Sequence, residues 1–313
     1  MKMTDVLIIG GGMAGLTAGM YVRRAGFSAV VFEKMFAGGQ AATTYEVENY
    51  PGFPDPIEGP DLMGRVLEQT QRFGLDINYD EVTSMDLSGP VKKVETTKDT
   101  YEGRAVIIAT GARPKKLEID GETRLTGQGV SYCATCDGAF FKGKKVAVVG
   151  GGNTAVEDAL YLANLGCDVH LIHRRDQLRA IQVLGDRAKE DDRITFHWNT
   201  IVTAIEGDQK VERLQLEDTE TGEKSALEVD GIFIGIGIEP VNELLHERVT
   251  LTEYGQVLTD FDLATDVVGV YAVGDIRYKS IRQIVSSAAD GAIAGTSAIR
   301  YLMEGPCQIR EDN

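Results

Sequence analysis

The chain has 313 residues, of which 43% are hydrophobic and 26% are charged, and its formal net charge is −16. This length is typical of about two domains, and the composition is typical of a soluble globular protein. No apolar run reaches the roughly 18 residues that a membrane helix needs, and the apolar stretch near the N-terminus is too short for a signal peptide. We therefore expect a cytoplasmic protein without a membrane segment. The negative charge repels phosphate backbones, which argues against nucleic acid as a partner.

The beginning of the chain predicts a strand, a glycine-rich turn, a helix and a second strand. The two strands are expected at residues 5–9 and 29–32, and the helix begins near Ala14. Two strands joined by a helical crossover form a βαβ unit, and such units build parallel sheets.

The turn of this unit carries Gly10, Gly12 and Gly15. Their spacing lets backbone N–H groups approach a pyrophosphate at the N-terminus of a helix. Glu33 follows the second strand, where a carboxylate accepts hydrogen bonds from ribose hydroxyls. The pattern predicts nucleotide binding, and the alternative is an ordinary tight turn followed by a surface acid.

The same pattern returns in the middle of the chain. Strands are expected at residues 145–149 and 168–172, with a helix from about 154 to 165 between them. The turn begins at Gly150 and has Ala155 in place of the third glycine, which is a permitted variant. An internal repeat of this kind indicates two nucleotide-binding folds in one chain.

The second unit ends differently from the first, because Arg174, Arg175 and Arg179 follow its last strand where the first unit has an acid. Guanidinium groups bind phosphate oxygens in pairs. If a helix begins here, the positive charges oppose its dipole, and a bound anion would offset that cost. The cluster predicts recognition of a 2′-phosphate, hence NADPH over NADH, and the alternative is a solvated basic patch.

Further elements are expected along the rest of the chain. Buried-type strands are expected at residues 104–111, 230–237 and 269–275. Two segments of mixed charge, 114–126 and 239–247, show no clear period and are interpreted as crossings between domains. A helix over residues 282–301 closes the chain.

We expect an α/β fold with two Rossmann-like, three-layer nucleotide-binding domains, the second inserted in the first. The first domain is predicted to comprise residues 1–115 and 243–313, and the second residues 116–242.

Cys133 and Cys136 form a CxxC motif that is followed directly by Asp137. A zinc site would need a second pair of ligands, and neither the other cysteines nor the histidines supply one, so no metal site is expected. A redox pair needs one thiolate of lowered pKa, and a helix predicted from Cys133 through Phe141 would help. Asp137 could exchange protons with the pair or be an ordinary acid in a first helical turn.

Five motifs occur here in one order: Gly-Gly-Gly-Met-Ala-Gly at 10–15, Cys-Ala-Thr-Cys-Asp at 133–137, Gly-Gly-Gly-Asn-Thr-Ala at 150–155, His-Arg-Arg-Asp-x-x-Arg at 173–179 and Tyr-Ala-Val-Gly-Asp at 271–275. Together they resemble the bacterial low-molecular-weight thioredoxin reductases. The resemblance covers nearly the whole chain, and the combination is far more specific than any one glycine motif.

The resemblance implies that the first domain binds FAD. It implies that Asp275 binds the ribityl chain and that residues 282–284 face the isoalloxazine. The implied FAD contacts are Gly10, Gly12, Gly15, Glu33, Gln40, Asn49, Gly111, Asp275, Arg282, Gln283 and Ile284.

The resemblance also implies a complete electron path, from NADPH to FAD, then to the cysteine pair, then to oxidised thioredoxin. Cys136 is implied to lie nearest the flavin, Cys133 to attack thioredoxin, and Asp137 to act as acid and base. Family members are usually homodimers that rotate one domain between two states. The implied NADPH contacts are Gly152, Asn153, Thr154, Arg174, Arg175 and Arg179.

Three alternatives remain at this point. Related flavoproteins take electrons from NADH or ferredoxin, and the intact arginine cluster argues against both. Ferredoxin–NADP reductases of similar fold lack the dithiol. A non-catalytic FAD-binding redox sensor would not need the complete second nucleotide motif.

Overall fold

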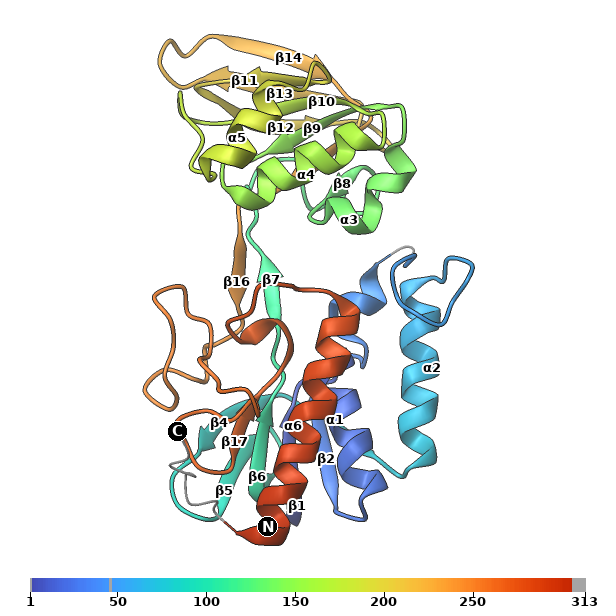
Figure 1. Cartoon of the computed structure of the whole chain (residues 1–313), viewed down its shortest axis with the longest axis vertical. Helices are drawn as coiled ribbons and strands as arrows, with labels where there is room; N and C mark the ends of the chain where they lie inside the picture. The colour runs from blue at the N-terminus through green and yellow to red at the C-terminus, as the bar shows by residue number, and fades with distance from the viewer. Residues whose placement is uncertain (1, 45–46, 306–313) are drawn as a thin grey trace. The chain divides into compact units, whose positions relative to one another are not determined.

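The computed structural model describes residues 2–44 and 47–305 and divides into two compact units (Figure 1). Unit 1 is Met1–Arg113 with Glu239–Asn313, and unit 2 is Pro114–Ile238. The chain passes between them through β7 (Ala112–Pro114) and β16 (Ile238–Pro240), which pair with each other. The two crossings between the units are thus short strands that pair with each other. They lie at the start of the two segments, 114–126 and 239–247, in which the sequence showed no hydrophobic period.

Within the described residues, unit 1 is built on a seven-stranded sheet. Six of the strands follow the order β3-β2-β1-β6-β5-β4, and the seventh, β17, pairs with β6. The first half of β6 pairs with β5 in an antiparallel ladder, and its second half pairs in parallel with β17. The neighbours of β1 and β2 are all parallel. The strands are β1 (Lys2–Ile9), β2 (Ala29–Glu33), β3 (Asp76–Tyr79), β4 (Val82–Asp86), β5 (Lys92–Thr96), β6 (Thr100–Ile108) and β17 (Val270–Ala272).

Strand β1 explains why this sheet has a core on both faces. Val6 and Ile8 belong to one buried cluster, and Leu7 and Ile9 belong to another, because successive side chains of a strand point to opposite faces. The first cluster includes side chains of three helices, α1 (Met13–Arg24), α2 (Gly59–Arg72) and α6 (Ile284–Glu304).

Helices α1 and α6 pack closely because Gly291, which has no side chain, lies at their contact. A Cβ atom on Gly291 would lie 2.3 Å from the carbonyl oxygen of Ala14. Figure 1 shows α1 beside part of the longer helix α6. Although α6 has 21 residues, no helix in the described part of the chain is long and apolar enough to cross a membrane.

The sheet of unit 2 is parallel throughout, and the described strands follow the order β11-β10-β9-β15-β8. One face is covered by helices and the other by a three-stranded antiparallel sheet, β12-β13-β14. The three-layer architecture confirms the predicted fold class. The elements are β8 (Val130–Ser131), α3 (Ala134–Asp137), β9 (Lys145–Val149), α4 (Asn153–Asn164), β10 (Asp168–Ile172), α5 (Gln182–Lys189), β11 (Ile194–His197), β12 (Thr200–Glu206), β13 (Arg213–Asp218), β14 (Lys224–Glu228) and β15 (Gly231–Ile234).

Two local features are more precise in the structure than in the sequence. No helix begins at the arginine cluster, because residues 173–181 form a loop and α5 starts only at Gln182, so the dipole cost considered above does not arise. The helix expected after Cys133 and through Phe141 is a single α turn, α3, followed by the 3-10 turn η2 (Gly138–Phe141). Helix α2, strands β3 to β5 and the antiparallel sheet of unit 2 were not expected from the sequence.

Two histidines on neighbouring strands of unit 2 share one hydrogen bond. His170 Nδ1 lies 2.8 Å from His197 Nε2, so only one of these two nitrogens carries the shared proton. Burial lowers the pKa of both rings, and the neighbouring carboxylate of Asp168 only partly opposes this for His170. The pair is therefore held neutral in the folded chain.

We predict that this pair weakens unit 2 in acid. A histidine whose pKa is lowered in the folded state binds its proton more readily when the chain is unfolded. Its contribution to the free energy of unfolding is therefore complete above about pH 6.5 and decreases as the pH falls below that value. Buried carboxyl groups in the same unit act in the opposite direction, so the comparison is between the wild type and His197→Gln. Urea unfolding at pH 7.5 and 5.5 can be followed by the fluorescence of Trp198, the only tryptophan.

Between pH 7.5 and 5.5, the urea concentration at the midpoint of unfolding should fall more in the wild type than in His197→Gln. Replacement of the exposed His246 by Gln is the control and should leave the wild-type pH dependence intact. Equal pH dependence in wild type and His197→Gln would contradict the prediction.

Candidate functional site

The first glycine turn places the start of α1 against the ends of two strands. A Cβ atom on Gly10 would lie 2.2 Å from the carbonyl oxygen of Ala109, and one on Gly15 would lie 2.0 Å from the carbonyl oxygen of Gly10. Gly10 also has φ +111°, which favours glycine. Gly12 has only one atom nearby, at 3.9 Å. The turn thus exposes backbone at the N-terminus of α1, which is a place where phosphate binds.

Glu33 lies beside this turn because β2 is parallel to β1. Its Oε2 accepts a hydrogen bond of 3.0 Å from the Gly11 N–H, and its Oε1 accepts one of 3.1 Å from Met35. A carboxylate has about four acceptor positions, so Glu33 retains acceptor capacity for hydroxyl groups.

The other predicted FAD residues lie around the same turn. Gly39 approaches Gly12, which brings Gln40 to the site, and the Gln40 amide donates a hydrogen bond to the carbonyl of Ala112. Gly111 follows the end of β6, beside the strand end that Gly10 contacts. These residues all lie at the carboxyl ends of parallel strands, where ligands of open α/β sheets bind.

The start of α6 joins the group through a long-range contact. Asn49 donates a hydrogen bond of 3.1 Å to Gln283 Oε1, and Gln283 also forms a capping box with Ser286 at the start of α6. Ile284 is the first residue of the helix. The Nε of Arg282 is buried and has no hydrogen-bond partner within the described residues.

Asp275 provides a second buried polar atom that has no hydrogen-bond partner among the described residues. It lies in the 3-10 turn η3 (Gly274–Ile276), which is held near α1 because Gly274 contacts Ala14. Its Oδ1 is buried and accepts no hydrogen bond in the described part of the chain. Buried acceptors are almost always satisfied, so a ligand hydroxyl fits here. The chain therefore fits FAD, whose ribityl chain carries hydroxyls and whose pyrophosphate suits the turn at Gly12.

The glycine turn of unit 2 repeats this geometry with a different neighbour. Gly150 contacts the carbonyl of Gly235, and Gly152 has open space around it. A Cβ atom on Gly151 would lie 2.2 Å from the ring of His173. The second turn is therefore packed directly against the residue that begins the arginine loop.

Three hydrogen bonds fix the arginine loop, residues 174–181, to the turn. The Gly151 carbonyl accepts from the N–H groups of Arg179 at 2.6 Å and Ala180 at 3.1 Å. The N–H of Ile181 donates to Asn153 Oδ1 at 2.9 Å. His173 donates from Nε2 to the Gln177 carbonyl, and burial lowers its pKa, which keeps the ring neutral.

The side chains of Arg174, Arg175 and Arg179 are exposed. None of the three forms an ion pair with any residue in the ranges 2–44 and 47–305. Three neighbouring guanidinium groups without carboxylate partners can hold a phosphate. Asn153 and the exposed Thr154 begin α4 beside them, so the predicted NADPH residues are neighbours.

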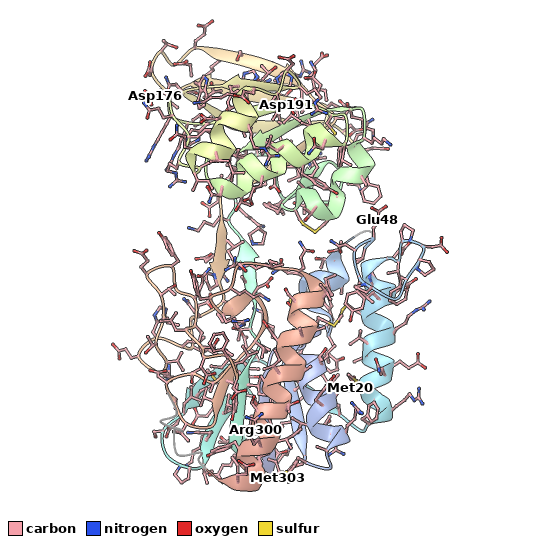
Figure 2. The ribbon with its side chains drawn as sticks, in the orientation of Figure 1. Met20, Glu48, Asp176, Asp191, Arg300 and Met303 are labelled. Carbon is pink, nitrogen blue, oxygen red and sulfur yellow. A yellow bond between two sulfur atoms is a disulfide. The ribbon has the colours of Figure 1, made fainter. Side chains whose placement is uncertain are left out.

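Cys133 and Cys136 form a disulfide (Figure 2, yellow bond beside α3). Cys133 caps α3 and Cys136 lies within it. Ser131 supports this turn from the end of β8: its Oγ accepts a hydrogen bond of 3.1 Å from the Cys133 N–H and donates one of 2.6 Å to Asp137 Oδ2. Burial raises the pKa of Asp137, and the hydrogen bond from Ser131 partly offsets the rise.

Ser131 and a buried ion cluster around Asp290 were not expected as parts of these sites, and His173 was part of a motif but had no role assigned to it. The sequence contains a signal for two of them, because His173 borders the arginines and Asp290 is an acid within an apolar helix. For Ser131 the only sequence signal is its position two residues before Cys133.

Comparison with known proteins agrees with this geometry. The model of the family "Pyridine nucleotide-disulphide oxidoreductase" matches residues 4–291. The thioredoxin reductase of Mycolicibacterium smegmatis is 46% identical over 96% of this chain and 97% of its own length. That of Listeria innocua is 44% identical over 97% of this chain and 95% of its own length.

A solved structure is similar over the same extent. The thioredoxin reductase of Streptococcus pyogenes has a TM-score of 0.89 and 41% identity, covering 96% of this chain and 98% of its own. Family match, sequence identity and structure thus agree over nearly the whole length. The chain belongs to the pyridine nucleotide-disulphide oxidoreductase family and, within it, to the thioredoxin reductases.

Proposed function

We propose that this chain is an enzyme that reduces the disulfide of a thioredoxin with electrons from NADPH. The observation that carries the proposal is a disulfide, Cys133–Cys136, in a chain with two nucleotide-type turns, one of which adjoins three exposed arginines that form no ion pair with any described residue. The relatives are named thioredoxin reductases, which supports the choice of protein substrate.

Unit 1 holds FAD in this proposal, and the turn and arginine loop of unit 2 hold NADPH. FAD, when bound, carries an electron pair between the nicotinamide and the disulfide. Glu33 accepts hydrogen bonds from ribose hydroxyls and Asp275 from the ribityl chain. Arg174, Arg175 and Arg179 bind the 2′-phosphate, which distinguishes NADPH from NADH.

The cysteines complete the reaction by thiol–disulfide exchange. The Cys133 thiolate attacks one sulfur of the thioredoxin disulfide, whose S–S bond breaks, and a mixed disulfide forms. Cys136 then attacks the sulfur of Cys133, which restores the Cys133–Cys136 disulfide and releases thioredoxin with two thiols. The two thioredoxin sulfurs take up two protons: the Cys136 thiol releases one when its sulfur attacks Cys133, and Asp137 supplies the other.

Asp137 suits this role because burial raises the pKa of its carboxyl group. A carboxylic acid with a raised pKa keeps its proton nearer to neutral pH, where an ordinary aspartate is ionised. Ser131 also connects Asp137 Oδ2 to the Cys133 backbone, so the carboxyl group belongs to the same turn as the cysteine pair.

We further propose that the protein is a cytoplasmic homodimer, as the family resemblance implies. NADH or ferredoxin as the electron source would leave the three arginines without a function. A non-catalytic FAD sensor would leave the whole turn of unit 2 without one. Both alternatives are therefore less well supported than NADPH-dependent reduction.

The first test separates flavin reduction from disulfide reduction. The purified protein should be yellow, and anaerobic NADPH should bleach its flavin absorbance. Cys133→Ser should still bleach but lose thioredoxin reduction by about a thousandfold or more, as expected for removal of a nucleophile. Cys167→Ala, which removes the other cysteine described in unit 2, should retain both reactions. Normal thioredoxin reduction by Cys133→Ser would contradict the exchange mechanism.

The second test concerns the choice of nucleotide. Arg174→Ala and Arg175→Ala should each lower kcat/KM for NADPH by about 10- to 100-fold, since a hydrogen bond to a charged group contributes roughly 1.5–3 kcal/mol. The value for NADH, which lacks the phosphate, should hardly change. Arg187→Ala, an exposed arginine of α5, is the control. An unchanged NADPH to NADH ratio in both loop variants would refute phosphate recognition.

The third test concerns Ser131. Ser131→Ala removes a hydrogen bond that lowers the pKa of Asp137, so that pKa should rise and the pH profile of thioredoxin reduction should shift to higher pH. Ser84→Ala removes a similar hydrogen bond, from Ser84 to Glu95, in unit 1 and should leave the profile in place. A shift toward lower pH, or none, in Ser131→Ala would argue against Asp137 as the proton donor.

A further inference from the structure

A buried carboxylate on α6 organises the turn that contains Asp275. Asp290 is 4% exposed, and its Oδ2 accepts hydrogen bonds of 3.0 Å from the Gly274 N–H and from Arg277 Nε. Its Oδ1 accepts another, also 3.0 Å, from Arg277 Nη2. Asp290 therefore holds both the residue before Asp275 and the arginine that follows the turn.

Lys279 connects this anchor to Asp275. Its Nζ lies 3.2 Å from Asp290 Oδ2 and 3.4 Å from Asp275 Oδ1. The Lys279 side chain is only 6% exposed. Lysine is almost never this deeply buried unless it is paired, so its position between two carboxylates is the reason that it can lie there.

The cluster balances its own charge. The two carboxylates, Asp275 and Asp290, face two cations, Arg277 and Lys279. Breaking one member of such a buried cluster leaves an uncompensated charge on its partner. Arg277 contacts Asp290 on both oxygens, whereas Lys279 is the cation that faces Asp275. Loss of Lys279 would therefore affect Asp275 more than Asp290.

Asp275 Oδ1, which forms the ion pair with Lys279, is also the buried oxygen that accepts no hydrogen bond from any described residue. The ion pair sets the direction of this oxygen, and its free acceptor position remains for a ligand. The ligand must carry a donor that is not a cation, since Lys279 already supplies the positive charge. A hydroxyl group meets that requirement.

We propose that Lys279, held by Asp290, is a positioning residue that orients the Asp275 carboxylate for the ribityl hydroxyls of FAD. The inference rests on the proposed function, because that function assigns FAD to unit 1. Lys279 acts through Asp275 and does not itself touch the cofactor. Its contribution to FAD affinity therefore depends on the presence of the Asp275 carboxylate.

A double-mutant cycle tests this dependence. Apoprotein is prepared for the wild type, Lys279→Met, Asp275→Asn and the double variant, and the Kd of FAD is measured from quenching of flavin fluorescence. Lys279→Met should bind FAD about tenfold more weakly, within the range for residues of one salt-bridge network. The double variant should bind FAD no more weakly than Asp275→Asn alone.

Lys2→Met is the matched control, because Lys2 forms an ion pair of 2.9 Å with Asp99 in the same unit but is exposed. Its FAD affinity should equal that of the wild type. Thermal unfolding of each apoprotein checks the fold, and if Lys279→Met is unstable, Lys279→Gln removes the same charge with a polar side chain.

An unchanged Kd in a folded Lys279 variant would overturn the inference. So would an equal loss of affinity in the wild-type and Asp275→Asn backgrounds, because Lys279 would then act independently of Asp275. Failure of the wild-type apoprotein itself to bind FAD is a different result, which would refute the proposed function.

Discussion

The close contact of a helix start with the backbone of a strand end is the constraint on which this structure depends. In unit 1, any side chain on Gly15 would have to overlap the carbonyl oxygen of Gly10, since a Cβ atom there would lie 2.0 Å from it. Adding even a methyl group to a contact of this kind costs about 1–3 kcal/mol or displaces the helix. With the glycines in place, the N-terminus of α1 lies at the carboxyl edge of the sheet, and Glu33, Gly111 and Asp275 meet there because their strands end at that edge.

Unit 2 uses the same contact for a different purpose. Its turn presses on the neutral ring of His173, and the Gly151 carbonyl accepts two hydrogen bonds from the arginine loop. The loop is therefore held against the turn, and its three cations have no carboxylate partner among residues 2–44 and 47–305. In the proposed function, the acid beside the first turn accepts hydroxyl groups and the arginines beside the second bind phosphate. The backbone geometry is shared, and the side chains after the second strand are what differs.

Both units also place a small polar cluster beside the site that reacts or binds. Ser131 joins the Cys133 backbone to Asp137, and Asp290 joins the Gly274 backbone to Lys279. In each cluster one buried side chain, Ser131 or Asp290, accepts a hydrogen bond from a backbone N–H and forms a second hydrogen bond with an ionisable side chain. Such clusters fix direction, because a buried polar group is costly unless it is paired, and pairing requires one arrangement of the side chains. The orientation of Asp137 and of Asp275 is thus set by residues outside the recognised motifs.

Much of this protein was predictable from local sequence. The glycine spacings, the alternating apolar strands and the CxxC motif each act over a few residues, so they indicated both nucleotide folds, the insertion of one fold in the other and the redox pair. The antiparallel sheet of unit 2 was missed because its strands are partly exposed and carry charged residues, without a buried apolar run that distinguishes them from loops. Nothing in the sequence around Lys279 indicates that it is buried, and its burial follows only from the contact with Asp290, 11 positions along the chain on α6. The sequence by itself determined which chemical groups are present and where the strands and helices of the two βαβ units lie, since those depend on neighbouring residues. Only the tertiary structure decided which polar groups lie together, because that depends on contacts such as Asn49 with Gln283 between residues far apart in the chain.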